Sequence, residues 1–113
     1  MIVAYSAEEG PSVRTENEIA ADVMGFLPVD GNWLSLERLL EELWRIGPTA
    51  SSLRALFAVF ERFPNDDGAG VFWSIVHGIE SLPIPYEAEL RESLARQHSE
   101  MGEIMLSRLE RSQ

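Results

Sequence analysis

The sequence of 113 residues contains no cysteine and no lysine, and the absence of cysteine restricts what the protein can be. Without cysteine the chain forms neither disulfides nor thiolate zinc sites, and it fits a reducing compartment. The first residues, 1–9, lack the basic start of a secretory signal peptide. No apolar run approaches the roughly 20 residues of a membrane-spanning helix. We therefore expect a cytoplasmic protein.

The length and composition predict one domain. Hydrophobic residues make up 45% of the chain and charged residues 25%, as is ordinary for a soluble globular protein. A chain of this length can enclose one core without metals or disulfides. We expect a single helical domain over residues 1–113, in which residues 1–14 form an irregular arm. Residues 1–5 could alternatively form a short strand.

The negative charge is large and unevenly distributed. All nine basic residues are arginine, against 19 acidic residues, so the formal net charge is −10. Residues 1–42 hold nine acids and two arginines, and residues 61–89 hold six acids and one arginine. Such a charge repels nucleic acid and anionic membranes, so we expect neither as a partner. It favours steered association with a basic protein. The alternative interpretation is that the charge only keeps the protein soluble.

Apolar residues recur along most of the chain at the i, i+3, i+4, i+7 spacing of a buried helix face. A capping box at Thr15 and Glu18 predicts the start of a first helix, which runs to about Leu27 before Pro28. Its inward side carries Ile19, Val23, Phe26 and Leu27.

Five further helical segments follow. The second ends at Gly47-Pro48, the third begins near residues 49–52 and ends before Pro64, and the fourth covers about residues 68–81. The fifth begins after Pro85, and Ser99 caps a sixth.

The predicted fold class is all-α, with five to six helices in antiparallel hairpins. Short linkers rich in Pro, Gly and Asp imply that successive helices are antiparallel neighbours. They form either a compact bundle or a short stack like an α-solenoid. No fixed repeat period is visible. We expect no sheet beyond a short strand near residues 2–5. The expected core includes Leu40, Leu43, Leu56, Phe57, Phe60, Ile75, Ile79 and Leu94.

Residues 66–80 stand out because the helix they predict has two distinct apolar or amphipathic stripes. Phe72, Ile75, Val76 and Ile79 form the stripe that any buried helix needs. Trp73, His77 and Glu80 form a second stripe that burial alone would not select. This second stripe is either a surface for a partner or a core edge where the Trp and His nitrogens find partners.

The sequence gives little support for a metal site. His77 and Glu80 are three residues apart, but His98 is the only other histidine. Residues 65–68 lack the ligand spacing of a calcium loop. Asp66 and Asp67 are better interpreted as a turn, in which Asp67 accepts hydrogen bonds from the first helical amides. We expect no metal and no cofactor.

Catalysis has equally little support. Ser74, His77 and Glu80 are the residue types of a catalytic triad. Positions on consecutive turns of one helix cannot converge on a substrate carbonyl beside an oxyanion hole. No glycine-rich phosphate loop follows a strand. Gly78 lies in mid-helix, where glycine costs about 1 kcal/mol relative to Ala, and we expect it to permit close helix packing. We therefore expect a binding protein rather than an enzyme.

Four segments between residues 36 and 110 carry a resemblance to a known family. They are Phe60-Glu61-Arg62-Phe63-Pro64, residues 67–80, Tyr86-Glu87-x-x-Leu90-x-x-Ser93-Leu94-x-Arg96-Gln97 and Met105-Leu106-x-Arg108-Leu109. The most specific part is Trp73-Ser74-x-x-His77-Gly78-x-Glu80, within the second segment. Together they resemble small bacterial proteins that are encoded beside polymorphic toxins and regarded as their immunity proteins. Residues 1–30 have no match. The resemblance implies an all-α protein that binds and neutralises one cognate toxin domain.

These observations combine into one functional hypothesis. We expect an immunity protein, or antitoxin, that occludes the active site of a cognate toxin domain with a basic binding surface. The alternative is an adaptor or chaperone that holds a secreted effector before export. The predicted partner-binding residues lie around one turn and helix: Glu61, Asp66, Asp67, Trp73, His77 and Glu80. The acidic segment 1–42 is the alternative location.

Overall fold

The computed structural model describes residues 14–112, and within this range the protein is all-helical. The predicted arm over residues 1–14 lies outside the described residues except for Arg14, and so does the optional strand near residues 2–5. Six α-helices are present in the described range. They are α2 (Glu16–Gly25), α3 (Leu34–Ile46), α4 (Leu53–Arg62), α5 (Val71–Ser81), α6 (Glu87–Arg96) and α7 (Glu100–Arg111). Two short 3₁₀ turns, Ala50–Ser52 and Gly68–Gly70, precede α4 and α5.

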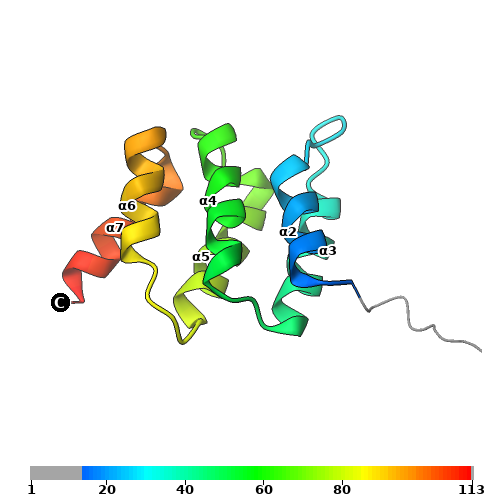
Figure 1. Cartoon of the computed structure of the whole chain (residues 1–113). Coiled ribbons are helices and arrows are strands. Elements are labelled where there is room, and N and C mark those ends of the chain that lie inside the picture. Colours follow the sequence, from blue (N-terminus) through cyan, green and yellow to red (C-terminus); the bar gives the residue numbers. More distant parts are fainter. Residues whose placement is uncertain (1–13, 113) are drawn as a thin grey trace, which may run out of the picture.

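The helices form three antiparallel hairpins stacked side by side in two layers (Figure 1). Helices α2, α4 and α6 make one layer, in which α4 contacts both neighbours. Helices α3, α5 and α7 make the other, in which α5 contacts both neighbours. Of the two arrangements left open by the sequence, the structure therefore has the solenoid-like stack.

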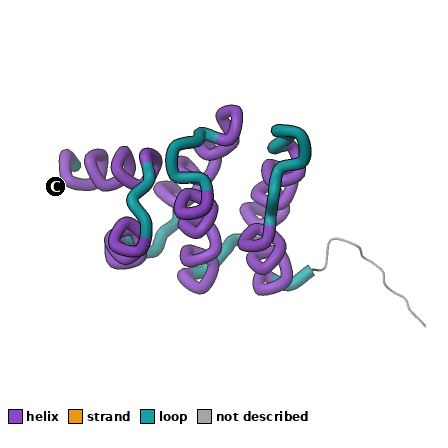
Figure 2. Tube along the Cα trace, turned by 90° about the horizontal axis from the view of Figure 1, so that it is seen from above, coloured by secondary structure: helices purple, strands orange, loops and turns teal. Residues whose placement is uncertain are grey.

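The connections within the three hairpins lie along one edge of the stack (Figures 1 and 2). They comprise residues 26–33, 63–70 and 97–99, and we call them the loop edge. Backbone hydrogen bonds and one arginine join them: the amide of Glu100 donates to the carbonyl of Pro64 at 2.9 Å, and Arg62 donates to the carbonyl of Phe26 at 2.5 Å. The linkers between hairpins lie at the opposite edge.

The helix starts follow the predicted local chemistry. The capping box is present, because the Thr15 hydroxyl accepts from the Glu18 amide at 3.1 Å and the Glu18 carboxylate accepts from the Thr15 amide at 2.8 Å. Ser99 caps α7 by accepting from the amide of Gly102 at 3.1 Å. Gly47 ends α3 at a φ of 76°, in the left-handed region that favours glycine.

The predicted end of the first helix was wrong. Helix α2 ends at Gly25, and Phe26 has an extended backbone. Phe26 remains buried, but Leu27 is 68% exposed and contributes nothing to the core. The reason is local: Pro28 disfavours helical geometry at the residue before it, so the helical spacing does not extend to Leu27.

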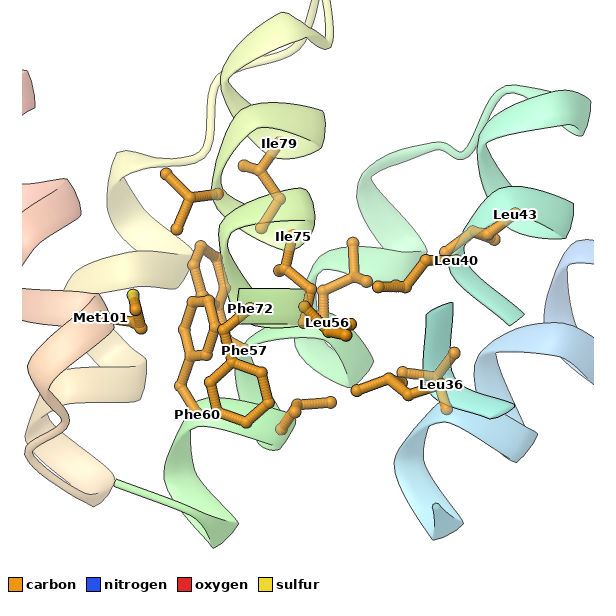
Figure 3. Close-up of a cluster of buried hydrophobic side chains, with 14 of the residues drawn as sticks. Leu36, Leu40, Leu43, Leu56, Phe57, Phe60, Phe72, Ile75, Ile79 and Met101 are labelled. Carbon is orange, nitrogen blue, oxygen red and sulfur yellow. The ribbon is translucent and has the colours of Figure 1, made fainter. Parts of the chain in front are cut away.

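The core runs continuously through the stack, with α4 at its centre (Figure 3). Most predicted core residues are buried, and Phe57, Phe60 and Phe72 are among its largest side chains. Leu94 is only partly buried and packs against the edge of this cluster. Residues 14–112 contain no named strand, only an isolated bridge between Val29 and Asn32. No described helix combines the length and apolarity required to cross a membrane.

Candidate partner-binding surface

Helix α5 presents Trp73 and His77 on one side, as the helical spacing predicts. Trp73 is half-buried and packs against the core, whereas His77 is exposed. Their ring centroids lie 5.9 Å apart with the planes tilted by 37°. The indole therefore packs against the core and leaves part of its surface beside an exposed imidazole, and contact of this pair with a partner stays a prediction.

Glu80, the third member of the stripe, is bound within the molecule. Its carboxylate accepts two hydrogen bonds from the Arg108 guanidinium of α7, at 2.8 and 2.9 Å. The Glu80 side chain is only 20% exposed. Burial, together with the negative charge of Glu80, raises the pKa of the nearby Tyr86 phenol. Glu80 therefore joins α5 to α7, and its negative charge is balanced by Arg108.

Glu61 makes a corresponding connection in the other layer. Its carboxylate accepts from the Ser93 hydroxyl at 2.7 Å and from the Arg96 guanidinium at 2.9 and 3.2 Å, so it links α4 to α6. Burial opposes ionisation of Glu61, but the hydrogen bonds from Arg96 and Ser93 outweigh it and lower its pKa. With its side chain 16% exposed, Glu61 offers a partner little free surface.

Asp66 and Asp67 form the turn that opens the α5 segment, and both are exposed. Asp66 accepts from the amide of Gly68 at 2.8 Å, and Asp67 accepts from the amide of Ala69 at 3.1 Å. The capping function predicted for Asp67 is therefore present, although it serves a 3₁₀ turn with Ala69 at a φ of 53°. Each of these hydrogen bonds uses one carboxylate oxygen and leaves the negative charge exposed on the loop edge.

Of the six predicted residues, the structure pairs the rings of Trp73 and His77, keeps Asp66 and Asp67 exposed on the turn before α5, and binds Glu61 and Glu80 within the molecule. Asp66 and Asp67 lie on the loop edge, and Trp73 and His77 follow on the first turns of α5. Glu61 and Glu80 lie between helices and are paired with arginines. That Glu61 and Glu80 lie at or beside the partner-binding surface remains a prediction.

The sequence analysis missed a second exposed feature, on the connection between α2 and α3. Leu27 and Val29 are 68% and 72% exposed, and Met24 and Leu34 on either side are 41% and 47% exposed. The sequence signal for this exposed connection is Asp30-Gly31, a typical two-residue turn, which indicates that Leu27 and Val29 precede a turn and are not part of a helix.

A groove of about 390 Å³ lies between α2 and α3, away from the predicted site residues. Two acidic residues in its lining, Asp22 and Glu42, both form ion pairs with Arg14, at 2.7 Å and 3.0 Å. The remaining lining consists of Ala21, Gly25, Ser35, Arg38 and Leu39. The groove holds no histidine and none of the partner-binding residues predicted from the sequence.

No group of side chains that could hold a metal ion is present among residues 14–112. In this range no three side chains of His, Asp or Glu converge closely enough to hold a metal ion. Ser74, His77 and Glu80 do not act as a unit, because the Glu80 carboxylate bonds to Arg108. The described surface presents exposed carboxylates, a Trp–His pair and exposed aliphatic side chains.

Comparison with known proteins found no matching family model, no matching curated protein and no matching solved structure. The fold alone defines the class of protein, which is a short stack of three α-helical hairpins.

Proposed function

We propose that the protein is an immunity protein that binds a cognate toxin domain and occludes its active site, without catalytic turnover of its own. The observation that carries the proposal is the Trp73–His77 ring pair on α5, with Trp73 half-buried and His77 exposed, directly after the exposed carboxylates of Asp66 and Asp67. The resemblance of residues 36–110 to immunity proteins is its second support.

Electrostatics supports a basic partner. With a net charge of −10, the protein attracts a positively charged surface over several ångströms and accelerates the encounter. Toxins that act on nucleic acids or other anionic substrates need basic clefts, so an acidic protein is complementary to such a cleft. Because Glu61 and Glu80 are balanced by arginines, the exposed Asp66 and Asp67 provide the uncompensated charge near α5.

The aromatic pair supplies the apolar part of such an interface. Interface energy concentrates in a few residues, Trp foremost, that are surrounded by polar contacts which exclude water. Trp73 is already held by the core, so little conformational entropy is lost when a partner covers its remaining surface. Occlusion needs only a binding surface, so the proposal assigns no reaction to the protein.

Co-expression tests the proposal directly. The proposal predicts a toxin gene beside the gene of this chain. That toxin is expressed from an inducible promoter with and without the chain, and growth is measured. We expect the chain to restore growth and to co-purify with the toxin domain in a defined stoichiometry. Failure to bind or to protect would reject the proposal. Binding without protection, together with a requirement for the chain in effector export, would favour the adaptor alternative.

A further inference from the structure

The connection between α2 and α3 holds its two most exposed aliphatic side chains on a tight turn. Leu27 and Val29 are 68% and 72% exposed, the highest values among large apolar side chains in the described part of the chain. Asp30 and Gly31 have φ angles of 53° and 73°, and the Asn32 amide donates to the Val29 carbonyl at 2.9 Å. Two consecutive positive φ values define a hairpin turn of the I′ type. This turn fixes the backbone that carries Val29.

The base of this connection is held by aromatic packing. Phe26 and Trp33, at its two ends, are each 8% exposed, with ring centroids 5.7 Å apart. The Trp33 ring also meets Phe63 and Phe72 edge-on, at 5.1 and 5.2 Å. These contacts join the connection to the second hairpin through a cluster of four aromatic rings.

An arginine holds the same base from α4. The Arg62 guanidinium donates to the carbonyl of Phe26 at 2.5 Å and to that of Val23 at 2.9 Å, so it satisfies carbonyls at the end of α2. The exposed side chains are therefore presented by a connection that is fixed at both ends. A preformed apolar projection loses less conformational entropy on binding than a flexible loop would.

The charge beside this projection selects the kind of partner. The three connections of the loop edge contain three acidic residues, Asp30, Asp66 and Asp67, and no arginine, and all three carboxylates are exposed. A second copy of the chain would bring the same carboxylates together, and an anionic membrane would be repelled. A surface that accepts Leu27 and Val29 next to these charges must combine an apolar depression with basic residues at its rim.

We propose that Leu27 and Val29 form an apolar anchor that inserts into a depression with a basic rim on the protein partner. The anchor extends the interface on α5 along the loop edge, through Asp66 and Asp67, to the first hairpin. This inference rests on the proposed function for the identity of the partner. Beyond that function, the inference states that Leu27 and Val29 contact the partner and that the contacted surface of the partner is an apolar depression with basic residues at its rim.

Binding measurements with matched variants test the anchor. The probe is the toxin domain encoded beside this chain's gene, inactivated by substitution, and its Kd is measured by calorimetry. The test variant is Leu27→Ser with Val29→Ser, and the control is Ile46→Ser, which alters a 41% exposed aliphatic residue at the other end of α3. We expect the double variant to weaken binding about 30-fold or more, as loss of an interface hot spot does, and the control to bind like wild type.

The charge is tested separately by Asp30→Asn. Asparagine tolerates a positive φ and keeps the turn, so only the charge is removed. We expect a slower association rate at low salt and convergence with wild type as the salt concentration rises. Circular dichroism and the thermal midpoint check that each variant folds as wild type does.

The outcomes separate this inference from the proposed function. If wild type binds and the folded double variant binds equally well, the anchor is rejected and the immunity function stands. If wild type itself does not bind the toxin domain, both are rejected. If wild type self-associates in size-exclusion chromatography and the double variant does not, the anchor is an interface between copies, and the inference of a basic partner is rejected.

Discussion

The indole of Trp44 on α3 lies directly against the backbone of Gly78 on α5. A Cβ atom at position 78 would come within 2.3 Å of the indole Cζ2 and 2.5 Å of Cη2. Distances below 3.0 Å do not occur at real Cβ atoms, so no larger residue fits without displacing the ring. The close packing predicted for this mid-helix glycine is confirmed, and it joins the first two hairpins within one layer.

We predict that Gly78→Ala destabilises the protein although alanine is the better helix former. Alanine gains about 1 kcal/mol of helix propensity, but the overlap with Trp44 costs typically 1–3 kcal/mol by overpacking. The expected result is a lower free energy of unfolding in urea, by up to about 2 kcal/mol.

The matched control is Gly25→Ala, since an added Cβ at position 25 meets no atom within 4 Å. That variant should be as stable as wild type or slightly more stable. In a double-mutant cycle, Trp44→Leu should remove most of the additional cost of Gly78→Ala. An additive cycle would show that Trp44 is not what excludes a side chain at position 78.

The second prediction concerns pH and the Glu61 carboxylate. Burial opposes ionisation, but the hydrogen bonds from Arg96 and Ser93 lower its pKa in the folded state below the unfolded value of about 4.3. The unfolded state thus binds the proton more tightly, so this contribution to stability is complete above the unfolded pKa and is lost as pH falls through the folded pKa. Thermal midpoints measured between pH 7 and pH 3 should fall in the acid range.

Glu61→Gln supplies the comparison. It retains the size of the side chain but not the charge paired with Arg96, so it should lower the midpoint at pH 7 and reduce the difference between pH 7 and pH 3. Glu37→Gln, at a glutamate in the first turn of α3, is the matched control. If Glu61→Gln and wild type have parallel pH profiles, the Glu61 contacts do not cause the acid sensitivity.

The third prediction concerns Glu16, which fastens the linker between the first two hairpins. Its carboxylate accepts from the Thr49 amide at 2.8 Å and from the hydroxyls of Thr49, Ser51 and Ser52. We expect Glu16→Ala to raise the rate of amide hydrogen exchange in residues 49–52 and to cost about 1 kcal/mol of stability. Asn17→Ala, at the neighbouring exposed position, should change neither. Unchanged exchange in Glu16→Ala would show that the linker is held without this carboxylate.

The helices were predictable because their determinants are local in sequence. The capping box at Thr15 and Glu18, the glycine at position 47 and the cap at Ser99 act within a few residues, and the apolar spacing marks the buried faces. Leu27 was misassigned because the same spacing continues by chance into Pro28 and the Asp30-Gly31 turn. There the local geometry of proline overrides the pattern.

The arrangement of the hairpins and the partners of the carboxylates were not predictable in the same way. Glu61 meets Arg96 and Glu80 meets Arg108 only because α4 lies beside α6 and α5 beside α7. A single sequence without a regular repeat does not specify these neighbours. The helical spacing did group Trp73 with His77, since both lie on one helix, but it could not tell how much of the indole the core covers.

The last prediction tests the surface on α5 itself. Trp73→Ala removes the indole, and Asp66→Asn with Asp67→Asn removes two charges while the amide oxygens keep the capping hydrogen bonds. We expect both variants to protect cells from the toxin less well than wild type, and Trp73→Ala to lose stability as well because its ring is half-buried. His77→Ala separates these effects, since His77 is exposed and its removal should impair toxin binding with little change in stability.

Circular dichroism establishes folding, and growth under toxin induction measures protection. If the folded variants at positions 66, 67, 73 and 77 all protect as well as wild type, the α5 surface is not the interface, and the acidic segment 1–42 becomes the better candidate.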